Sequence, residues 1–119
     1  MGKSLMMRGV PFARMLSSEY CRALTTAQLM NVVPAANIEQ NKEITYWVYD
    51  EANRCTNTMA LLAVEPPADA NTGMISHAGN VCLTLDSLAW SEAAIYKPNG
   101  MGGSTFIARV KWNEWDALP

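Results

Sequence analysis

This sequence of 119 residues is short of charge and of histidine. Charged residues make up 17% of it, against about 25% in a typical soluble domain, while half of its residues are hydrophobic. The only histidine, His77, has no acid-rich cluster beside it, which argues against a zinc site built from protein ligands. The glycine cluster at residues 100–105 lacks the lysine and the spacing of a phosphate loop, so a glycine-rich turn is the simpler interpretation.

The three cysteines are too few and too scattered for a disulfide scaffold. Cys21, Cys55 and Cys82 are about thirty residues apart and form no C-x-x-C pair, which also excludes a zinc knuckle. We therefore predict a cytoplasmic localisation, with Cys21 and Cys82 in the core and Cys55 exposed in a loop. No apolar run approaches eighteen residues, so the sequence predicts no membrane span.

Length and charge bound the organisation of the chain. A chain of 119 residues fits a single α+β domain, residues 1–119, with one core. Lys3, Arg8 and Arg14 precede the first acidic residue, which predicts a flexible basic arm at about residues 1–10. The formal net charge of −2 gives no reason to expect a nucleic acid as partner.

Helical spacing is concentrated before Pro34. Apolar residues recur every three or four positions from Phe12 to Leu24, which predicts a first amphipathic helix. Thr25 and Gln28 stand at the positions of a capping box, which predicts a second, short helix from about Thr26 to Val33.

After residue 42 the apolar pattern changes to a period of two. Strands are predicted at about 43–50, 57–65, 81–86 and 104–112, with a long loop at 68–80, while residues 87–97 fit either helix or strand. The first two of these strands are apolar on both faces, so both faces need cover. The fold class predicted is α+β, with two N-terminal helices packed on an antiparallel meander of about four strands, which could curve strongly.

Two functions of different classes follow from this predicted fold. The leading hypothesis is a non-enzymatic interaction module that forms a homo-oligomer, most simply a dimer, through an apolar and aromatic sheet face. The alternative is a small-molecule-binding protein, or an enzyme, with an apolar pocket enclosed by a curved sheet. The residues predicted to serve as interface or ligand site are Tyr46, Trp47, Tyr49 and Trp90.

The sequence provides no firm candidate for catalysis. A thiol–imidazole pair of His77 with Cys55 or Cys82 is the one obvious nucleophilic arrangement, and a buried thiol is the more ordinary role of Cys82. Asp86 or Glu92 could act as an acid or base beside the aromatic residues if there is a reaction. We therefore predict no catalytic residue, no metal site and no cofactor.

Overall fold

The computed structural model describes residues 1–45, 48–77 and 88–118. The chain divides into two compact units, which we describe separately. Unit 1 consists of Met1–Tyr49 and Pro66–His77, and unit 2 consists of Asp50–Glu65 and Ala78–Pro119.

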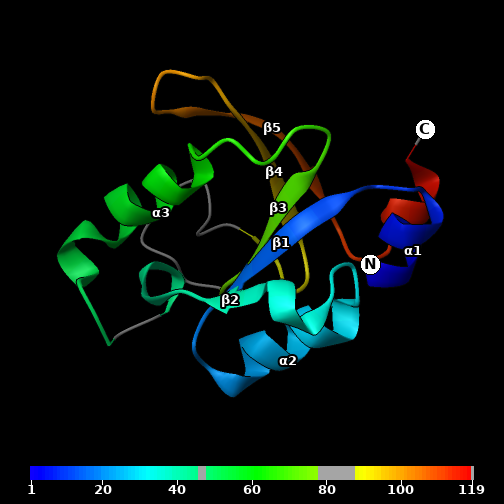
Figure 1. The fold of residues 1–119 in the computed structure, drawn as a ribbon, viewed down its shortest axis with the longest axis horizontal. Helices are drawn as coiled ribbons and strands as arrows, with labels where there is room; N and C mark the ends of the chain where they lie inside the picture. The colour runs from blue at the N-terminus through cyan, green and yellow to red at the C-terminus, as the bar shows by residue number, and fades with distance from the viewer. Residues whose placement is uncertain (46–47, 78–87, 119) are drawn as a thin grey trace. The chain divides into compact units, whose positions relative to one another are not determined.

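Unit 1 is built on a three-stranded parallel sheet (Figure 1). The strands are β1 (Phe12–Ser17), β2 (Ile38–Gln40) and β3 (Asn71–Ile75), and their order in the sheet is β2-β1-β3. Helix α1 (Gly2–Met7) precedes β1, and helix α2 (Cys21–Met30) connects β1 to β2. The short 3-10 helices η1 (Ala35–Asn37) and η2 (Lys42–Ile44) flank β2.

The core of unit 1 lies where the central strand β1 meets α2. Neighbouring residues Met15 and Leu16 are both buried, although their side chains point to opposite faces of the strand. Burial on both faces is what a central parallel strand requires. Gly73 on β3 makes room for the core, because a Cβ there would lie 2.1 Å from the Met15 sulfur.

Helix α2 packs one face against the sheet, and the buried residues of that face are small. Ala23 and Ala27 are its buried residues, and α2 contacts all three strands of the sheet. Asn31 closes the helix in the left-handed conformation, with φ at 51°, which asparagine tolerates better than most residues. α1 packs against the end of α2, where Gly2 approaches the backbone of Met30 so closely that a Cβ would lie 2.2 Å from its carbonyl oxygen.

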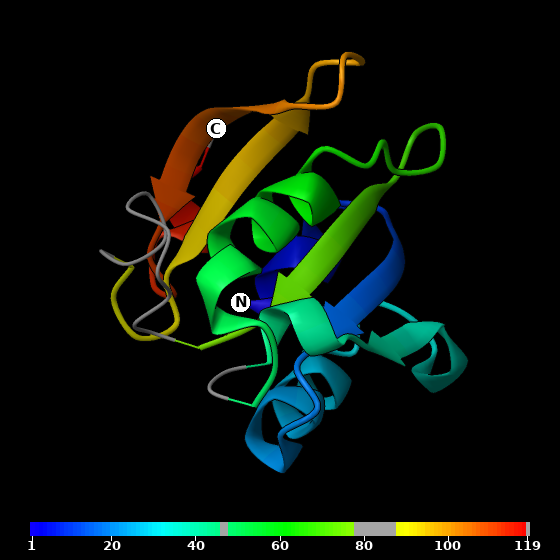
Figure 2. The same cartoon turned by 90° about the vertical axis from the view of Figure 1, so that its left-hand side faces the viewer.

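Unit 2 combines a helix with a β-hairpin (Figure 2). Its elements are η3 (Glu51–Asn53), α3 (Arg54–Leu62), β4 (Ala93–Pro98), β5 (Ser104–Val110) and η4 (Trp115–Ala117). β4 and β5 pair antiparallel with one bulge, and α3 contacts β4. Gly100 and Gly102 in the connecting turn have φ of +71° and +77°, a conformation that favours glycine.

The predicted fold class is wrong. The described residues contain three α-helices, a parallel three-stranded sheet and a two-stranded antiparallel hairpin, with no closed or curled sheet, in place of a four-stranded antiparallel meander. The segment predicted as a strand at 57–65 lies mostly in α3, because its Met, Ala and Leu residues are strong helix formers. The segment predicted as a strand at 43–50 begins inside η2.

Two further segments differ from the prediction. Phe12 to Ser17 were predicted to begin a helix and form the central strand β1. The loop predicted at 68–80 contains β3, whose short TGMI run is half-buried and pairs with β1. The strand predicted at 104–112 is confirmed as β5, and the ambiguous segment 87–97 ends in β4. The strand predicted at 81–86 lies outside the described residues.

The predicted N-terminal arm at about residues 1–10 contains α1, in which Gly2 and Leu5 are buried. Across residues 1–45, 48–77 and 88–118, no helix has the length and apolar character needed to cross a membrane.

Candidate functional site

The candidate site lies in unit 1, at the carboxyl ends of β1 and β3. The two strands are parallel, so the residues that follow them emerge at the same edge of the sheet. Ser18 continues the pairing, since its N–H donates to the carbonyl oxygen of Ile75 over 3.0 Å. In open α/β sheets, ligands bind outside the carboxyl ends of the strands. A binding site is therefore expected at this edge.

Three side chains at this edge form a chain of hydrogen bonds. Arg22 Nε donates to Nδ1 of His77 over 3.2 Å, and Nε2 of His77 lies 2.7 Å from the hydroxyl oxygen of Ser18. The N–H of Tyr20 donates to the same hydroxyl oxygen over 3.3 Å. We call Ser18, Tyr20, Arg22 and His77 the carboxyl-end cluster.

The direction of these bonds excludes a serine nucleophile activated by His77. A guanidinium group only donates, so Nδ1 of His77 must accept and its Nε2 must carry the proton. Nε2–H then donates to Ser18, whereas a general base would have to accept the serine proton at that nitrogen. Ser18 is also fully buried, so a substrate does not reach it. Ser18 therefore positions the imidazole.

Arg22 is held in place from two sides. Its guanidinium carbon lies 4.7 Å above the centre of the Tyr20 ring, a cation–π contact, while Nε is fixed by His77. The Tyr20 and His77 rings meet edge to face, with centroids 5.2 Å apart. The bond to His77 uses one guanidinium N–H, and the group has four more that can donate.

The start of α2 adds positive potential beside Arg22. The helix has no side-chain cap at Tyr20 and no acidic residue in its first turn. The N–H groups of the first turn therefore keep their partial positive charge. Helix dipole and guanidinium charge have the same sign at this point. Together they favour a negatively charged group at the carboxyl-end cluster.

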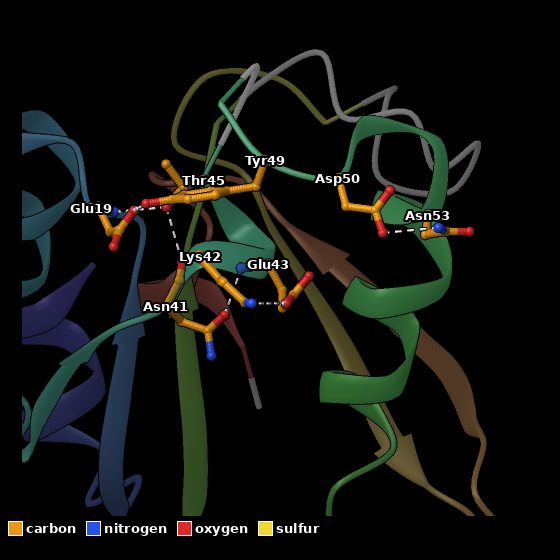
Figure 3. Close-up of polar contacts among 8 residues, drawn as sticks. All are labelled: Glu19, Asn41, Lys42, Glu43, Thr45, Tyr49, Asp50 and Asn53. Carbon is orange, nitrogen blue, oxygen red and sulfur yellow. Dashed lines mark hydrogen bonds and ion pairs between the residues drawn. The ribbon is translucent and has the colours of Figure 1, made fainter.

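Glu19 is the acidic residue nearest in sequence, and its contacts are shown in Figure 3. The Tyr49 hydroxyl donates to its carboxylate over 2.5 Å, and its backbone N–H donates to the Thr45 hydroxyl oxygen over 2.9 Å. Thr45 in turn donates to the carbonyl oxygen of Asn41. The Glu19 carboxylate is thus engaged by a phenol from the segment that follows β2.

The Glu19 contact should be visible in the titration of Tyr49. The hydrogen bond to Glu19 raises the pKa of Tyr49 above 10.0, with smaller contributions from burial and from the carboxylate charge. Because the folded-state pKa is raised, the contact stabilises the fold below pH 10 and is lost as the pH rises through the higher folded-state value. NMR titration of ring-labelled tyrosine should show the pKa of Tyr49 raised above 10.0.

Glu19→Ala should return the pKa of Tyr49 towards 10, and Glu39→Ala on β2 is the matched control that should not. Equal Tyr49 titration curves in the wild type and in Glu19→Ala would disprove the contact.

Two of the four residues predicted as interface or ligand site, Tyr49 and Trp90, are among the described residues, and they belong to different units. Tyr49 lies beside Glu19 and is exposed. Trp90 in unit 2 is 87% exposed. Tyr46 and Trp47 lie outside the described residues, so their predicted role stays a prediction. Sequence reasoning missed Ser18 and Arg22, for which the only signal was the single histidine that they contact.

The cysteines differ from the prediction. Cys21 was predicted to be buried, yet it is an exposed free thiol at the first position of α2. Cys55 was predicted to be an exposed thiol in a loop, yet it lies in α3 and is disulfide-bonded. A disulfide removes the thiolate that a nucleophilic pair with His77 needs.

Two acidic residues of the segment 43–50 make local contacts (Figure 3). Asp50 accepts a hydrogen bond from Asn53 over 2.9 Å, and Glu43 lies 3.8 Å from the Lys42 ammonium group. Within the part of the chain that the structure describes, no three His, Cys, Asp or Glu side chains gather in a group that could hold a metal ion.

Comparison with models of protein families, with curated proteins and with solved structures gave no match to this chain.

Proposed function

We propose that the protein binds a small anionic molecule, such as a phosphate or carboxylate compound, at the carboxyl-end cluster. The observation that carries the proposal is the pair of contacts that fix Arg22, one to His77 and one to Tyr20, at the uncapped start of α2. This proposal is a form of the small-molecule-binding hypothesis. The pocket enclosed by a curved sheet is no longer part of it, because the sheets do not curl.

Preorganisation is the physical reason for expecting binding here. An arginine on a free surface loses side-chain entropy when it binds a ligand, whereas Arg22 is already held by two contacts. A hydrogen bond to a charged group contributes about 1.5–3 kcal/mol. Loss of Arg22 should therefore weaken anion binding by about tenfold to a hundredfold.

Isothermal titration with inorganic phosphate tests the proposal. We expect Arg22→Ala to lose most of the affinity and the wild-type affinity to fall as salt is added. Arg14→Ala is the matched control, since Arg14 lies on β1 and pairs with Glu39 at 3.8 Å. The proposal would be wrong if Arg22→Ala bound phosphate as tightly as Arg14→Ala and the wild type do. It would also be wrong if the wild type bound no phosphate.

Self-association is the second candidate function, and exposed apolar side chains in unit 2 favour it. Phe106 and Ile107 on β5 are exposed, as is Trp112 two residues beyond the strand. Large apolar side chains that are exposed together are typical of association surfaces, and burying them against a second copy would stabilise the hairpin. In this form of the homo-oligomer hypothesis the contact is made by exposed apolar side chains of the β4–β5 hairpin.

Light scattering behind a sizing column tests the dimer. We expect a dimer at micromolar concentration and a monomer in Ile107→Asp, because a buried unpaired charge opposes association. Val64→Asp changes an equally exposed valine just after α3 and is the matched control. A monomeric wild type would exclude this candidate.

The predicted cytoplasmic localisation stays a prediction. Its basis was the pattern of three cysteines, and the disulfide at Cys55 counts against it, because disulfides are rare in reducing compartments.

A further inference from the structure

The carboxyl-end cluster lies where the order of the parallel strands reverses. The chain passes from β1 through α2 to β2 on one side of β1, and it later returns to β3 on the other side. Ser18 follows β1 and His77 follows β3, so the cluster lies at the carboxyl ends of the two strands that meet at the reversal. In open α/β sheets, such a reversal is where ligands bind. The topology of unit 1 therefore supports a ligand site here independently of the charge of Arg22.

Arg22 offers a ligand the outer end of its guanidinium group. Its Nε is bonded to His77, and among the described residues no acceptor is bonded to its two Nη atoms. The side chain is exposed, so a ligand reaches these atoms. Two parallel N–H groups bind two oxygens of a carboxylate or of a phosphate. The guanidinium group alone therefore does not select between these anions.

Two backbone N–H groups at the start of α2 are the further donors. The N–H groups of Ala23 and Leu24 both donate to the carbonyl oxygen of Tyr20. Those of Cys21 and Arg22 have no acceptor in the part of the chain that the structure describes. A helical side chain points back towards the N-terminus of its helix, and the guanidinium carbon of Arg22 lies over the ring of Tyr20, the N-cap residue. The guanidinium group and the two N–H groups are therefore at the same end of α2.

We infer that the ligand carries a phosphate monoester group in place of a carboxylate, an inference that rests on the proposed anion binding at the carboxyl-end cluster. A carboxylate has two oxygens, and the end of the guanidinium group uses both. A phosphate group has a third terminal oxygen, which accepts from the N–H groups of Cys21 and Arg22. Its second negative charge matches the guanidinium charge combined with the positive end of the helix dipole.

Benzoate, benzenesulfonate and phenyl phosphate are the probes, because they share a phenyl ring. Benzoate and benzenesulfonate each carry one charge, but the first has two terminal oxygens and the second has three. Phenyl phosphate has three terminal oxygens and, at about pH 8, two charges. In isothermal titration we expect benzenesulfonate to bind about tenfold more tightly than benzoate, because it makes a further charge-assisted hydrogen bond. Phenyl phosphate should bind most tightly.

Cys21→Pro removes one of the backbone donors and keeps the helix. Proline is favoured at the first position of a helix, and Tyr20 before it has φ −70° and ψ 135°, which suit a residue that precedes proline. We expect Cys21→Pro to weaken benzenesulfonate and phenyl phosphate by a factor of about three to ten and to leave benzoate unchanged. Cys21→Ala loses the thiol and keeps the N–H, so this matched control should bind all three probes as the wild type does. Circular dichroism checks that both variants are folded.

Equal affinities of the wild type for benzoate and benzenesulfonate would overturn the inference. So would a phenyl phosphate affinity no higher than that for benzenesulfonate, or unchanged benzenesulfonate binding in folded Cys21→Pro. Failure of the proposed function looks different, because then no probe binds, or Arg22→Ala binds the probes as tightly as the wild type does. That outcome would remove the inference together with the proposed function.

Discussion

Met15→Ala is expected to lower the free energy of unfolding by about 2–5 kcal/mol, the range for a buried methionine replaced by alanine. Met15 is 1% exposed and lies in the core cluster with Ala27 and Val33. Removal of its side chain would leave a void between β1 and α2. Gly73 cannot fill that void, because it has no side chain. Urea unfolding followed by circular dichroism measures the change.

Met7→Ala is the matched control. Met7 lies at the end of α1 and is 76% exposed, so the same change in side chain removes almost no buried surface. We expect its effect to stay within about 0.5 kcal/mol, as for most surface substitutions. Similar losses in Met15→Ala and Met7→Ala would contradict the core described for unit 1.

The prediction was right for the last strand and partly right for α2. The strand at 104–112 was recognisable because residues such as Thr105 and Ile107 have high β propensity and a glycine-rich turn precedes them. The helix predicted from about Thr26 to Val33 overlaps α2, although α2 begins earlier, at Cys21. The local signal was sufficient for the strand, whereas the predicted capping box of Thr25 and Gln28 lies inside α2 and placed the start of the helix wrongly.

The secondary-structure prediction was wrong where the apolar pattern fits the period of a helix and the period of a strand equally well. The segment 57–65 alternates as a strand does, yet Met59, Ala60 and Leu62 favour a helix, and the intrinsic propensity prevailed. Phe12 to Ser17 fitted helical spacing, but burial between two neighbouring strands makes a strand the better solution there. Pairing with residues about sixty positions away is invisible to a local pattern.

The candidate site was missed for the same reason. His77 was noticed as the only histidine, but its contacts with Ser18 and Arg22 span 59 and 55 positions in the sequence. They arise only because β1 and β3 are parallel neighbours, and β3 had been predicted as a loop. A prediction that had placed a strand at Asn71–Ile75 would have brought His77 to the carboxyl end of β1.

The orientation of the hydrogen bonds also decides which chemistry the site can support. A lone serine–histidine contact suggests a nucleophile, but Arg22 imposes the tautomer in which His77 donates to Ser18. The same guanidinium that prevents base catalysis carries the positive charge on which the proposed anion binding depends. Residue types alone would have supported either interpretation, and the donor at Nδ1 distinguishes them.

Ile44→Ala is expected to cost about 2–5 kcal/mol of unfolding free energy, whereas Val48→Ala should cost less than about 0.5 kcal/mol. If residues 43–50 formed a strand, Ile44 and Val48 would lie on one face and be buried alike. In the structure Ile44 closes η2 and is 1% exposed, while Val48 is 57% exposed. The pair therefore tests the corrected fold at the segment on which the predicted interface depended. Urea unfolding of both variants gives the comparison, and equal losses would restore the strand and the apolar face it was predicted to carry.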